Sequence, residues 1–255
     1  LSLSLRYRAR SGEPLESLLV EAFALVREAG RRKVNMRHFD VQLLGGAAVH
    51  FDSIVEMQTG EGKTLTATLP LYLAALEGKG APLATVNDYL AQRDADQMRP
   101  LYGVRGMKVG CIQSQMPQPD RKKQYSCDIT YGTANEMGFD FLRDRLLKRR
   151  IGEGQRDLFG AMLGRAGAGN EEPVQGELHF MLVDEADSIL IDEARTPLII
   201  SAMPGEEEER EAEAYRWAAK FAPEFVEDDH YEYDHKDKTV ELTLAGRRRV
   251  REIAK

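Results

Sequence analysis

One stretch, MQTGEGKT at residues 57–64, constrains this sequence more than any other. It follows a short apolar run at residues 54–57, which we predict to be a strand, and it opens a helical pattern that extends to Leu76. A strand, a glycine loop and a helix in that order are the context of a phosphate-binding loop. Gly60 and Gly62 would let backbone N–H groups turn toward a phosphate, and the helix N-terminus would add its positive dipole.

The polar residues of this loop predict its chemistry. Lys63 would contact the β- and γ-phosphates of ATP as a point charge, and the Thr64 hydroxyl would ligate Mg²⁺. The usual pattern has a further glycine at the position of Met57. A loop that only joins a strand to a helix is therefore the alternative, although the strand and helix around it favour phosphate binding.

A second stretch with candidate functional residues, HFMLVDEAD at residues 179–187, is an apolar run that ends in two carboxylates. It predicts a buried strand with acids at its C-terminal end, where open α/β sheets bind their ligands. Asp184 would hold Mg²⁺ through water, because this ion loses its hydration shell reluctantly. Glu185 would polarise the attacking water. Adjacent acids after a strand also occur as ordinary caps, but Lys63 and Thr64 upstream favour a metal–phosphate site.

A glutamine upstream of the loop is a candidate for base recognition. Gln42 lies in MRHFDVQLLGG at residues 36–46. Its amide carries both a donor and an acceptor, so it can pair with N6 and N7 of adenine. Phe39 could pack near the ring. An isolated glutamine would be interpreted as an exposed polar residue, and only the phosphate-binding loop downstream favours the adenine interpretation.

Composition narrows the class of protein. The net charge of −7 argues against a general nucleic-acid binder with a basic face, although a local basic groove remains open. The two cysteines, Cys111 and Cys127, fit no zinc pattern and favour a reducing compartment. No run of about 18 apolar residues is present to span a membrane. The chain begins with Leu and stops within a helical pattern, so we expect a fragment of a longer protein.

Strands alternate with helices along most of the chain, which predicts an α/β fold: a parallel sheet with helices on both faces. Asn87 is the expected N-cap of one helix. The predicted helices span residues 15–32, 65–76, 89–101, 117–124 and 134–147, and the predicted strands span 83–86, 108–112, 128–131 and 179–183. Residues 188–201 predict a helical turn followed by another strand.

Two later segments break this alternation. Residues 148–176 are glycine-rich and predict a mobile insertion, with a short helix near 158–163. From residue 203 the composition shifts, and a charged helix from 206 is followed by strands at 228–235 and 239–244 and a last helix from 245. Tyr215, Trp217 and Phe221 are expected on the packing face of the charged helix. These elements predict the start of a second, smaller α+β domain.

Longer runs of the sequence carry a family resemblance. The runs FDVQLLGG, MQTGEGKTLTATLP, TVNDYLAQRD, DITYGTANEMGFDFLRD and DEADSILIDEARTPLIIS closely resemble the SecA family of bacterial preprotein translocase motors, over about residues 15–255. The resemblance implies a P-loop NTPase of helicase superfamily 2. Residues 1–202 would be most of the first nucleotide-binding domain, with the insertion at 148–176, and residues 203–255 would begin the preprotein cross-linking domain. The residues that would contact ATP are Gln42, Gly60, Glu61, Gly62, Lys63 and Thr64, with Asp184 and Glu185 as the acidic pair.

The same resemblance implies a function and partners. ATP and Mg²⁺ would be the cofactors, with Lys63 and Glu185 as catalytic residues, and hydrolysis would drive unfolded preproteins through the SecYEG channel. The protein would be cytoplasmic and peripheral on the cytoplasmic face of the inner membrane. It would contact anionic phospholipid and form a homodimer at full length, and nucleic acid is not an expected partner. The family's second nucleotide-binding domain, which supplies an arginine, is absent, so we expect weak ATPase activity from this fragment.

Several positions depart from the family pattern. Ala186 replaces the usual valine, so residues 184–187 spell DEAD, as in RNA helicases. Ala134 stands in place of an asparagine, and Asp144-Arg145 in place of Asp-Asn. A DEAD-like nucleic-acid helicase and a non-catalytic scaffold are the alternatives to the translocase motor. The role of Arg195 is open between coupling the nucleotide to a neighbouring domain and a structural ion pair, for instance with Asp192.

Overall fold

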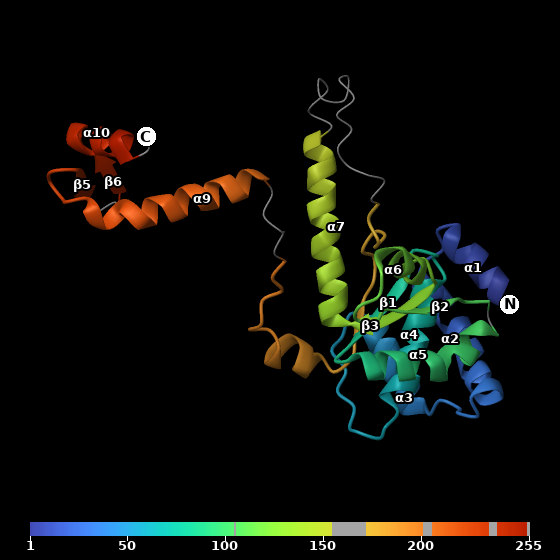
Figure 1. Cartoon of the computed structure of the whole chain (residues 1–255). Helices are drawn as coiled ribbons and strands as arrows, with labels where there is room; N and C mark the ends of the chain where they lie inside the picture. Colours follow the sequence, from blue (N-terminus) through green and yellow to red (C-terminus); the bar gives the residue numbers. More distant parts are fainter. Residues whose placement is uncertain (105, 155–171, 201–205, 235–238, 254–255) are drawn as a thin grey trace. The chain divides into compact units, whose positions relative to one another are not determined.

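The computed structural model describes residues 1–104, 106–154, 172–200, 206–234 and 239–253 (Figure 1). These residues form two compact units, Leu1–Ile200 and Ser201–Lys255. Within the described ranges, no helix combines the length and the apolar character needed to cross a membrane.

The first unit is built on a parallel sheet of four described strands in the order β2-β3-β1-β4. In its centre, Leu83 lies opposite Tyr131 on one side and Leu182 on the other. Nearly all residues of β1, β2 and β3 are buried, because both faces of the sheet are covered. The strands are β1 (Ala81–Thr85), β2 (Val109–Cys111), β3 (Ile129–Thr133) and β4 (Leu182–Val183).

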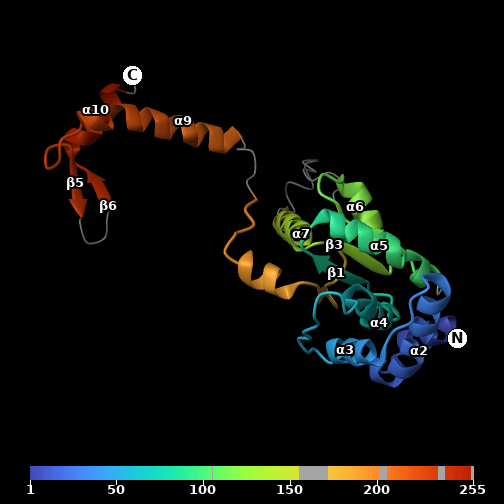
Figure 2. The same cartoon turned by 90° about the horizontal axis from the view of Figure 1, so that it is seen from below.

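Neighbouring residues of β3 show that helices cover both faces of this sheet. The Tyr131 hydroxyl lies 3.3 Å from the Tyr102 hydroxyl of α5 (Asp88–Gly103). The Thr130 hydroxyl points to the other face and donates to the Gln124 carbonyl of α6 (Gln118–Tyr125) at 2.9 Å. Helix α7 (Ala134–Gly154) begins on that second face, where its Met137 lies against Gly132. Figure 2 shows this helix beside β3. The predicted α/β architecture is therefore confirmed.

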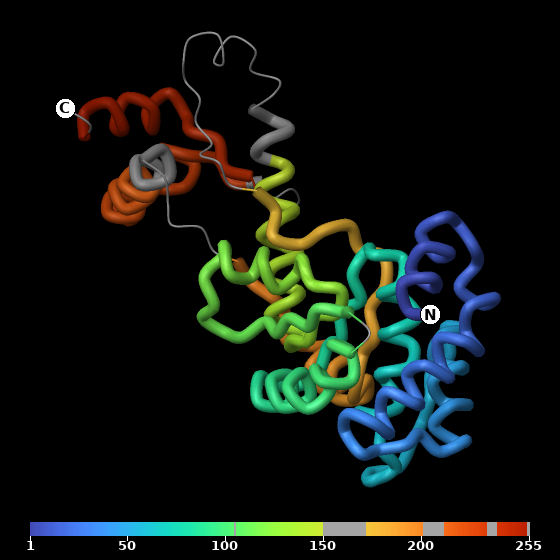
Figure 3. The backbone as a smooth tube through the Cα atoms, turned by 90° about the vertical axis from the view of Figure 1, so that its right-hand side faces the viewer, coloured from blue at the N-terminus to red at the C-terminus, as the bar shows by residue number. Residues whose placement is uncertain are grey.

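The helix that follows the glycine loop, α4 (Lys63–Ala75), is buried from Leu65 to its end. It packs against β1, α2 (Leu15–Lys33) and α3 (Asp40–His50), and Figure 3 shows these N-terminal helices side by side. The sequence predicted α2 and α4 but not α1 (Ser2–Arg10), whose Leu5 and Ala9 are buried. The N-cap prediction for α5 is correct, since Asn87 Oδ1 accepts from the Leu90 N–H at 2.8 Å.

Two predicted strands are wrong. Residues 54–57 form no strand: Val55 and Met57 lie against Gly45 of α3, and the side chain of Ile54 is 98% exposed. Exposed and partly buried residues alternate along this segment, as they do in an extended chain. The described sheet consists of β2, β3, β1 and β4, so residues 54–57 pair with none of its strands. Residues 197–200 are likewise irregular, and the π-helical turn Ser188–Asp192 precedes them.

The structure describes both ends of the segment predicted as an insertion, residues 148–176. Helix α7 continues to Gly154 instead of ending at residue 147. Residues 172–176 return along it, since the Asp144 carboxylate accepts from the N–H groups of Val174 and Gln175 at 2.9 and 2.8 Å. The short helix predicted at 158–163 lies outside the described residues.

The second unit contains α9 (Glu206–Phe221), the antiparallel hairpin of β5 (Tyr231–Asp234) and β6 (Thr239–Leu242), and α10 (Leu244–Ile253). Both strands are shorter than predicted. The rings of Trp217 and Phe221 lie 5.3 Å apart, one helical turn from each other. Tyr215 is 74% exposed, so its expected place on the same packing face is wrong.

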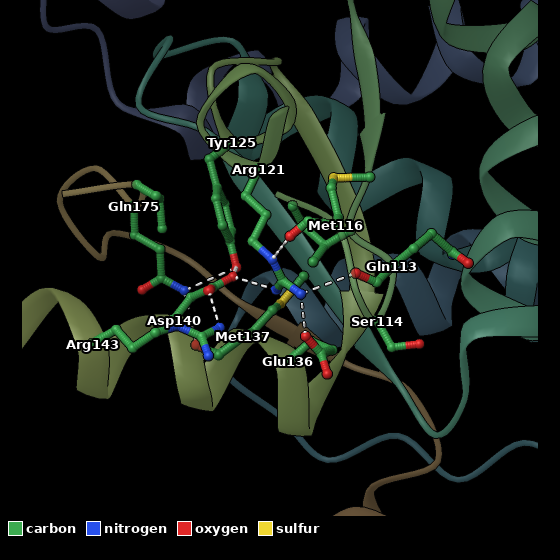
Figure 4. A network of polar contacts seen from close by, with 12 residues as sticks. Gln113, Ser114, Met116, Arg121, Tyr125, Glu136, Met137, Asp140, Arg143 and Gln175 are labelled. Atoms are coloured by element: carbon green, nitrogen blue, oxygen red, sulfur yellow. Dashed lines mark hydrogen bonds and ion pairs between the residues drawn. The ribbon is translucent and has the colours of Figure 1, made fainter. Parts of the chain in front are cut away.

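A buried polar network joins α6 to α7 (Figure 4). Arg121 donates to Asp140 at 2.9 Å and to Glu136 at 2.5 Å, and it also binds the backbone carbonyls of Gln113 and Met116. Asp140 is fully buried and accepts from Tyr125 as well. Since a buried charge is tolerated only when it is paired, these contacts fix the start of α7 on the sheet.

Candidate nucleotide-binding site

The glycine loop has the backbone geometry of an anion site. Gly60 and Gly62 have φ angles of +93° and +83°, in the left-handed region that favours glycine. Gly62 is the N-cap of α4, and no side chain caps this helix end. The N–H groups of the first turn of α4 are therefore open to an anion, and the helix dipole favours one.

Two residues of the predicted site follow directly on α4. Lys63 and Thr64 are the first residues of the helix, and both are partly buried. Within the part of the chain that the structure describes, neither side chain has a hydrogen-bond or ion-pair partner. A partly buried lysine without an ion-pair partner fits a phosphate ligand.

The acidic pair lies at the carboxyl end of β4. The Asp184 N–H donates to the Ala84 carbonyl at 2.9 Å, which continues the pairing of β4 with β1 by one residue. The Asp184 carboxylate accepts from the Glu185 N–H at 3.0 Å. Glu185 is exposed and has a φ of +55°, a strained value for a residue with a side chain. Strain of this kind is typical of functional positions.

Electrostatics connects the loop to the acids. Burial raises the pKa of Asp184, and the charges of Glu185 and Asp94 raise it further. The Glu185 N–H and the Lys63 ammonium act in the opposite direction and lower this pKa. The Lys63 charge therefore acts on Asp184 within electrostatic range, although the two side chains form no ion pair among the described residues.

Gln42 lies against the loop. It is 4% exposed, and its Oε1 accepts from the Phe39 N–H at 3.0 Å while its Nε2 donates to the Glu61 carbonyl at 2.7 Å. The Glu61 carboxylate accepts from the Gln58 N–H at 2.8 Å. Phe39 is 72% exposed. Pairing of Gln42 with adenine stays a prediction: its amide keeps one N–H and one lone pair beyond these contacts.

Sequence reasoning missed two buried polar residues near this site. His38 is 1% exposed and bonds to α4. Asp94, 3% exposed and paired with Arg93, raises the pKa of Asp184 from α5. Asp94 had a signal in the sequence, because it is the one charged residue in the apolar stripe of α5 formed by Ala91, Ala95, Met98, Leu101 and Tyr102.

The residues present fit Mg²⁺ together with a triphosphate. Within the described ranges, no three or more His, Cys, Asp or Glu side chains form a group that could hold a metal. Mg²⁺ does not need such a group, since it commonly takes one or two protein oxygens and fills its remaining positions with water and phosphate. Asp184 and Thr64 supply oxygens of this kind.

A comparison with protein families decides where the chain belongs. The model of the SecA DEAD-like domain matches residues 2–252. The chain belongs to this family. The resemblance drawn from the sequence runs is thereby confirmed.

Other SecA proteins are similar over almost all of this chain. Protein translocase subunit SecA 2 of Rhodopirellula baltica is 57% identical over 254 residues, covering 100% of this chain and 39% of that protein. Protein translocase subunit SecA 1 of Thermobifida fusca is 52% identical, covering 94% of this chain and 22% of that protein. The chain therefore spans well under half of these relatives.

A solved structure described as a hypothetical ATP-dependent RNA helicase from Sulfolobus tokodaii also aligns with this SecA-family chain. Its TM-score is 0.41 at 15% identity, and the alignment covers 69% of this chain and 56% of that one. A likeness this distant carries no argument about function.

Proposed function

We propose that this chain is the ATP-binding motor domain of a SecA-type protein translocase, which couples ATP hydrolysis to the export of unfolded preproteins through the SecYEG channel. The observation that carries the proposal is an unpaired Lys63 at the uncapped start of α4, near Asp184, in a chain of the SecA DEAD-like family. A catalytic motor needs a cation and a carboxylate at one edge of the sheet, and a scaffold does not.

Each predicted residue has a role in this proposal. Gly60, Glu61 and Gly62 turn backbone N–H groups toward the phosphates, and Lys63 binds the β- and γ-phosphates. Thr64 and Asp184 hold Mg²⁺, which supplies charge neutralisation on the phosphates when bound. Glu185 orients the attacking water. Gln42 and Phe39 contact the base.

The proposal also assigns domains, partners and a cellular location. Residues 1–202 are the first nucleotide-binding domain, with the insertion at 148–176, and residues 203–255 begin the preprotein cross-linking domain. The partners are the SecYEG channel, unfolded preprotein and anionic phospholipid, with a homodimer for the full-length protein. The site of action is the cytoplasmic face of the inner membrane.

The chain by itself is proposed to hydrolyse ATP slowly. Motors of this class complete their site with an arginine from a second domain, and such an arginine is worth on the order of 10³–10⁵ in rate. Turnover by this chain at the rate of the longer translocase would contradict that part of the proposal.

The test of function is ATPase activity of the longer protein that carries this chain, measured with SecYEG-bearing vesicles and an unfolded preprotein. The translocase proposal expects stimulation only when channel and preprotein are both present. No stimulation when both are present would contradict it.

The DEAD string at residues 184–187 is the one feature that favours a nucleic-acid helicase instead. Filter binding with RNA and DNA across a salt series separates the two functions. A helicase predicts tight binding that weakens steeply with salt, because phosphate contacts release counterions. With a net charge of −7, we expect no such binding.

A further inference from the structure

A buried histidine joins the segment before α3 to the helix that carries the loop. The Nε2 atom of His38 lies 3.0 Å from the carbonyl oxygen of Leu65 and 3.1 Å from Thr68 Oγ1. The Thr68 hydroxyl already donates to the same carbonyl at 2.6 Å. Since a carbonyl only accepts, the proton is on Nε2 and is donated to Leu65. Nδ1 is buried and has no partner among the described residues, so one ring nitrogen makes the connection to α4.

The same segment is fastened to α2 on its other side. Arg27 Nε donates to the His38 carbonyl at 2.9 Å, and Arg27 Nη2 donates to Asp40 Oδ1 at 2.9 Å. The Met36 N–H donates to the Gly30 carbonyl at 3.1 Å. A Cβ at Gly30 would lie 2.6 Å from the Met36 carbonyl oxygen, so the absence of a side chain there lets the segment lie directly on α2.

A second connection to the loop comes from Gln42, whose Nε2 donates to the Glu61 carbonyl at 2.7 Å. Residues 36–42 are therefore bonded to the phosphate-loop region at two points, His38 to Leu65 and Gln42 to Glu61. The proposed base contacts, Phe39 and Gln42, lie on this doubly bonded segment. The two bonds set where a base can lie relative to the phosphates.

We infer that His38 is a positioning residue, which holds segment 36–42 in register with the phosphate loop and so sets the preference for a nucleotide over a triphosphate without a base. The inference rests on the proposed function. His38 bonds to α4 through its ring and to α2 through its carbonyl, and both contacts hold the segment in place.

The test compares Mg²⁺-dependent binding of ATP and of inorganic tripolyphosphate to the parent chain, His38→Gln and His38→Asn. A glutamine amide nitrogen reaches the place of Nε2, whereas an asparagine amide nitrogen reaches only the place of the partnerless Nδ1. The parent and His38→Gln should prefer ATP by about the same factor. His38→Asn should lose about tenfold in ATP affinity, the effect of one buried hydrogen bond, and no more than about twofold in tripolyphosphate affinity.

A matched control is Thr68→Val, which deletes the neighbouring hydroxyl and leaves the bond from His38 to Leu65; it should keep the parent's preference. Equal losses of ATP and tripolyphosphate affinity in His38→Asn, or unchanged ATP affinity, would overturn the inference and leave His38 a core residue. If His38→Asn does not fold, His38→Gln is the deciding variant, because it keeps the bond to Leu65. Loss of its preference for ATP over tripolyphosphate would then overturn the inference. A parent that binds neither ligand contradicts the proposed function itself.

Discussion

The side-chain nitrogen of Gln42 occupies the space in which a Cβ on Gly62 would lie. Gly62 also has a φ of +83°, so two independent constraints require glycine there. Gly12 shares the positive φ, at +92°, but no described atom lies within 4 Å of its missing Cβ. The contact between Gln42 and Gly62 places residues 36–42, which carry the proposed base contacts, directly against the phosphate loop.

Alanine at these two glycines separates the constraints. Gly12→Ala should lower the free energy of unfolding by about 1–2 kcal/mol, because only the left-handed backbone opposes it. Gly62→Ala should cost about 1–3 kcal/mol more, because its methyl group also displaces Gln42. Urea unfolding of both variants measures the difference. In a Gln42→Ala background the difference between the two variants should shrink. Equal losses of unfolding free energy for Gly12→Ala and Gly62→Ala would show that Gln42 does not oppose the methyl group.

Asp184→Asn should stabilise the free protein. Burial raises the pKa of Asp184 in the folded state, so the charged form is disfavoured there relative to the unfolded chain. A raised carboxyl pKa means that stability increases as the pH falls from the folded pKa toward the ordinary value, and that the charge is a cost above both. Asparagine removes that charge and can still accept from the Glu185 N–H.

The measurement for Asp184→Asn is thermal melting at neutral pH with and without ATP and Mg²⁺. The variant should melt higher than the parent without ligand and should show less of the Mg²⁺-dependent gain. A lower melting temperature without ligand would mean that the buried charge is compensated by its neighbours.

His38 should make stability depend on pH. Burial lowers the pKa of His38 from 6.5 to about 4, and the nearby Arg27 charge also lowers it, while the bond to the Leu65 carbonyl opposes the shift. A lowered histidine pKa gives stability that is complete above the unfolded value and is lost as the pH falls from about 6.5 to about 4. The loss at the low end is about 3 kcal/mol. Urea unfolding at several pH values should show a shallower slope for His38→Gln, and identical slopes would contradict the assignment.

Arg121→Met should be among the most destabilising single changes in the first unit. It removes one of the two arginines that pair with the fully buried Asp140 and leaves only the partly exposed Arg143 as its counter-ion. Breaking a buried ion pair by removing one partner costs up to about 3–5 kcal/mol. Lys123→Met is the matched control on the same helix, because Lys123 is exposed. Its effect should stay within about 0.5 kcal/mol in urea unfolding. A comparable effect for the two variants would mean that the network contributes little.

The sequence predicted the parts of this molecule that depend on local signals. The glycine loop before α4 and the acids after β4 were found because their residue types and spacing carry the chemistry. The cap at Asn87 was found for the same reason. The extended segment at residues 54–57 was mistaken for a strand because a short apolar run does not show whether a partner strand is present.

Tertiary contacts explain the residues that were missed. His38 has no pattern around it that distinguishes a buried donor from a surface histidine, and only the fold places Leu65 beside it. Asp94 had a local signal, but its proximity to Asp184 depends on how α5 packs on the sheet. Gln42 was predicted to contact the adenine base, which stays a prediction, and its bond to Glu61 of the loop was not foreseen.

The most direct test of the account is a calorimetric titration of ATP with Mg²⁺ into this chain, into Lys63→Ala and into Lys123→Ala. Lys63→Ala removes the cation from the start of α4, whereas Lys123→Ala removes an exposed lysine from α6. The account predicts that the parent and Lys123→Ala bind alike and that Lys63→Ala binds at least about tenfold more weakly, as expected for loss of a charged hydrogen bond. Equal affinities for Lys63→Ala and the parent, or no binding by the parent, would contradict it.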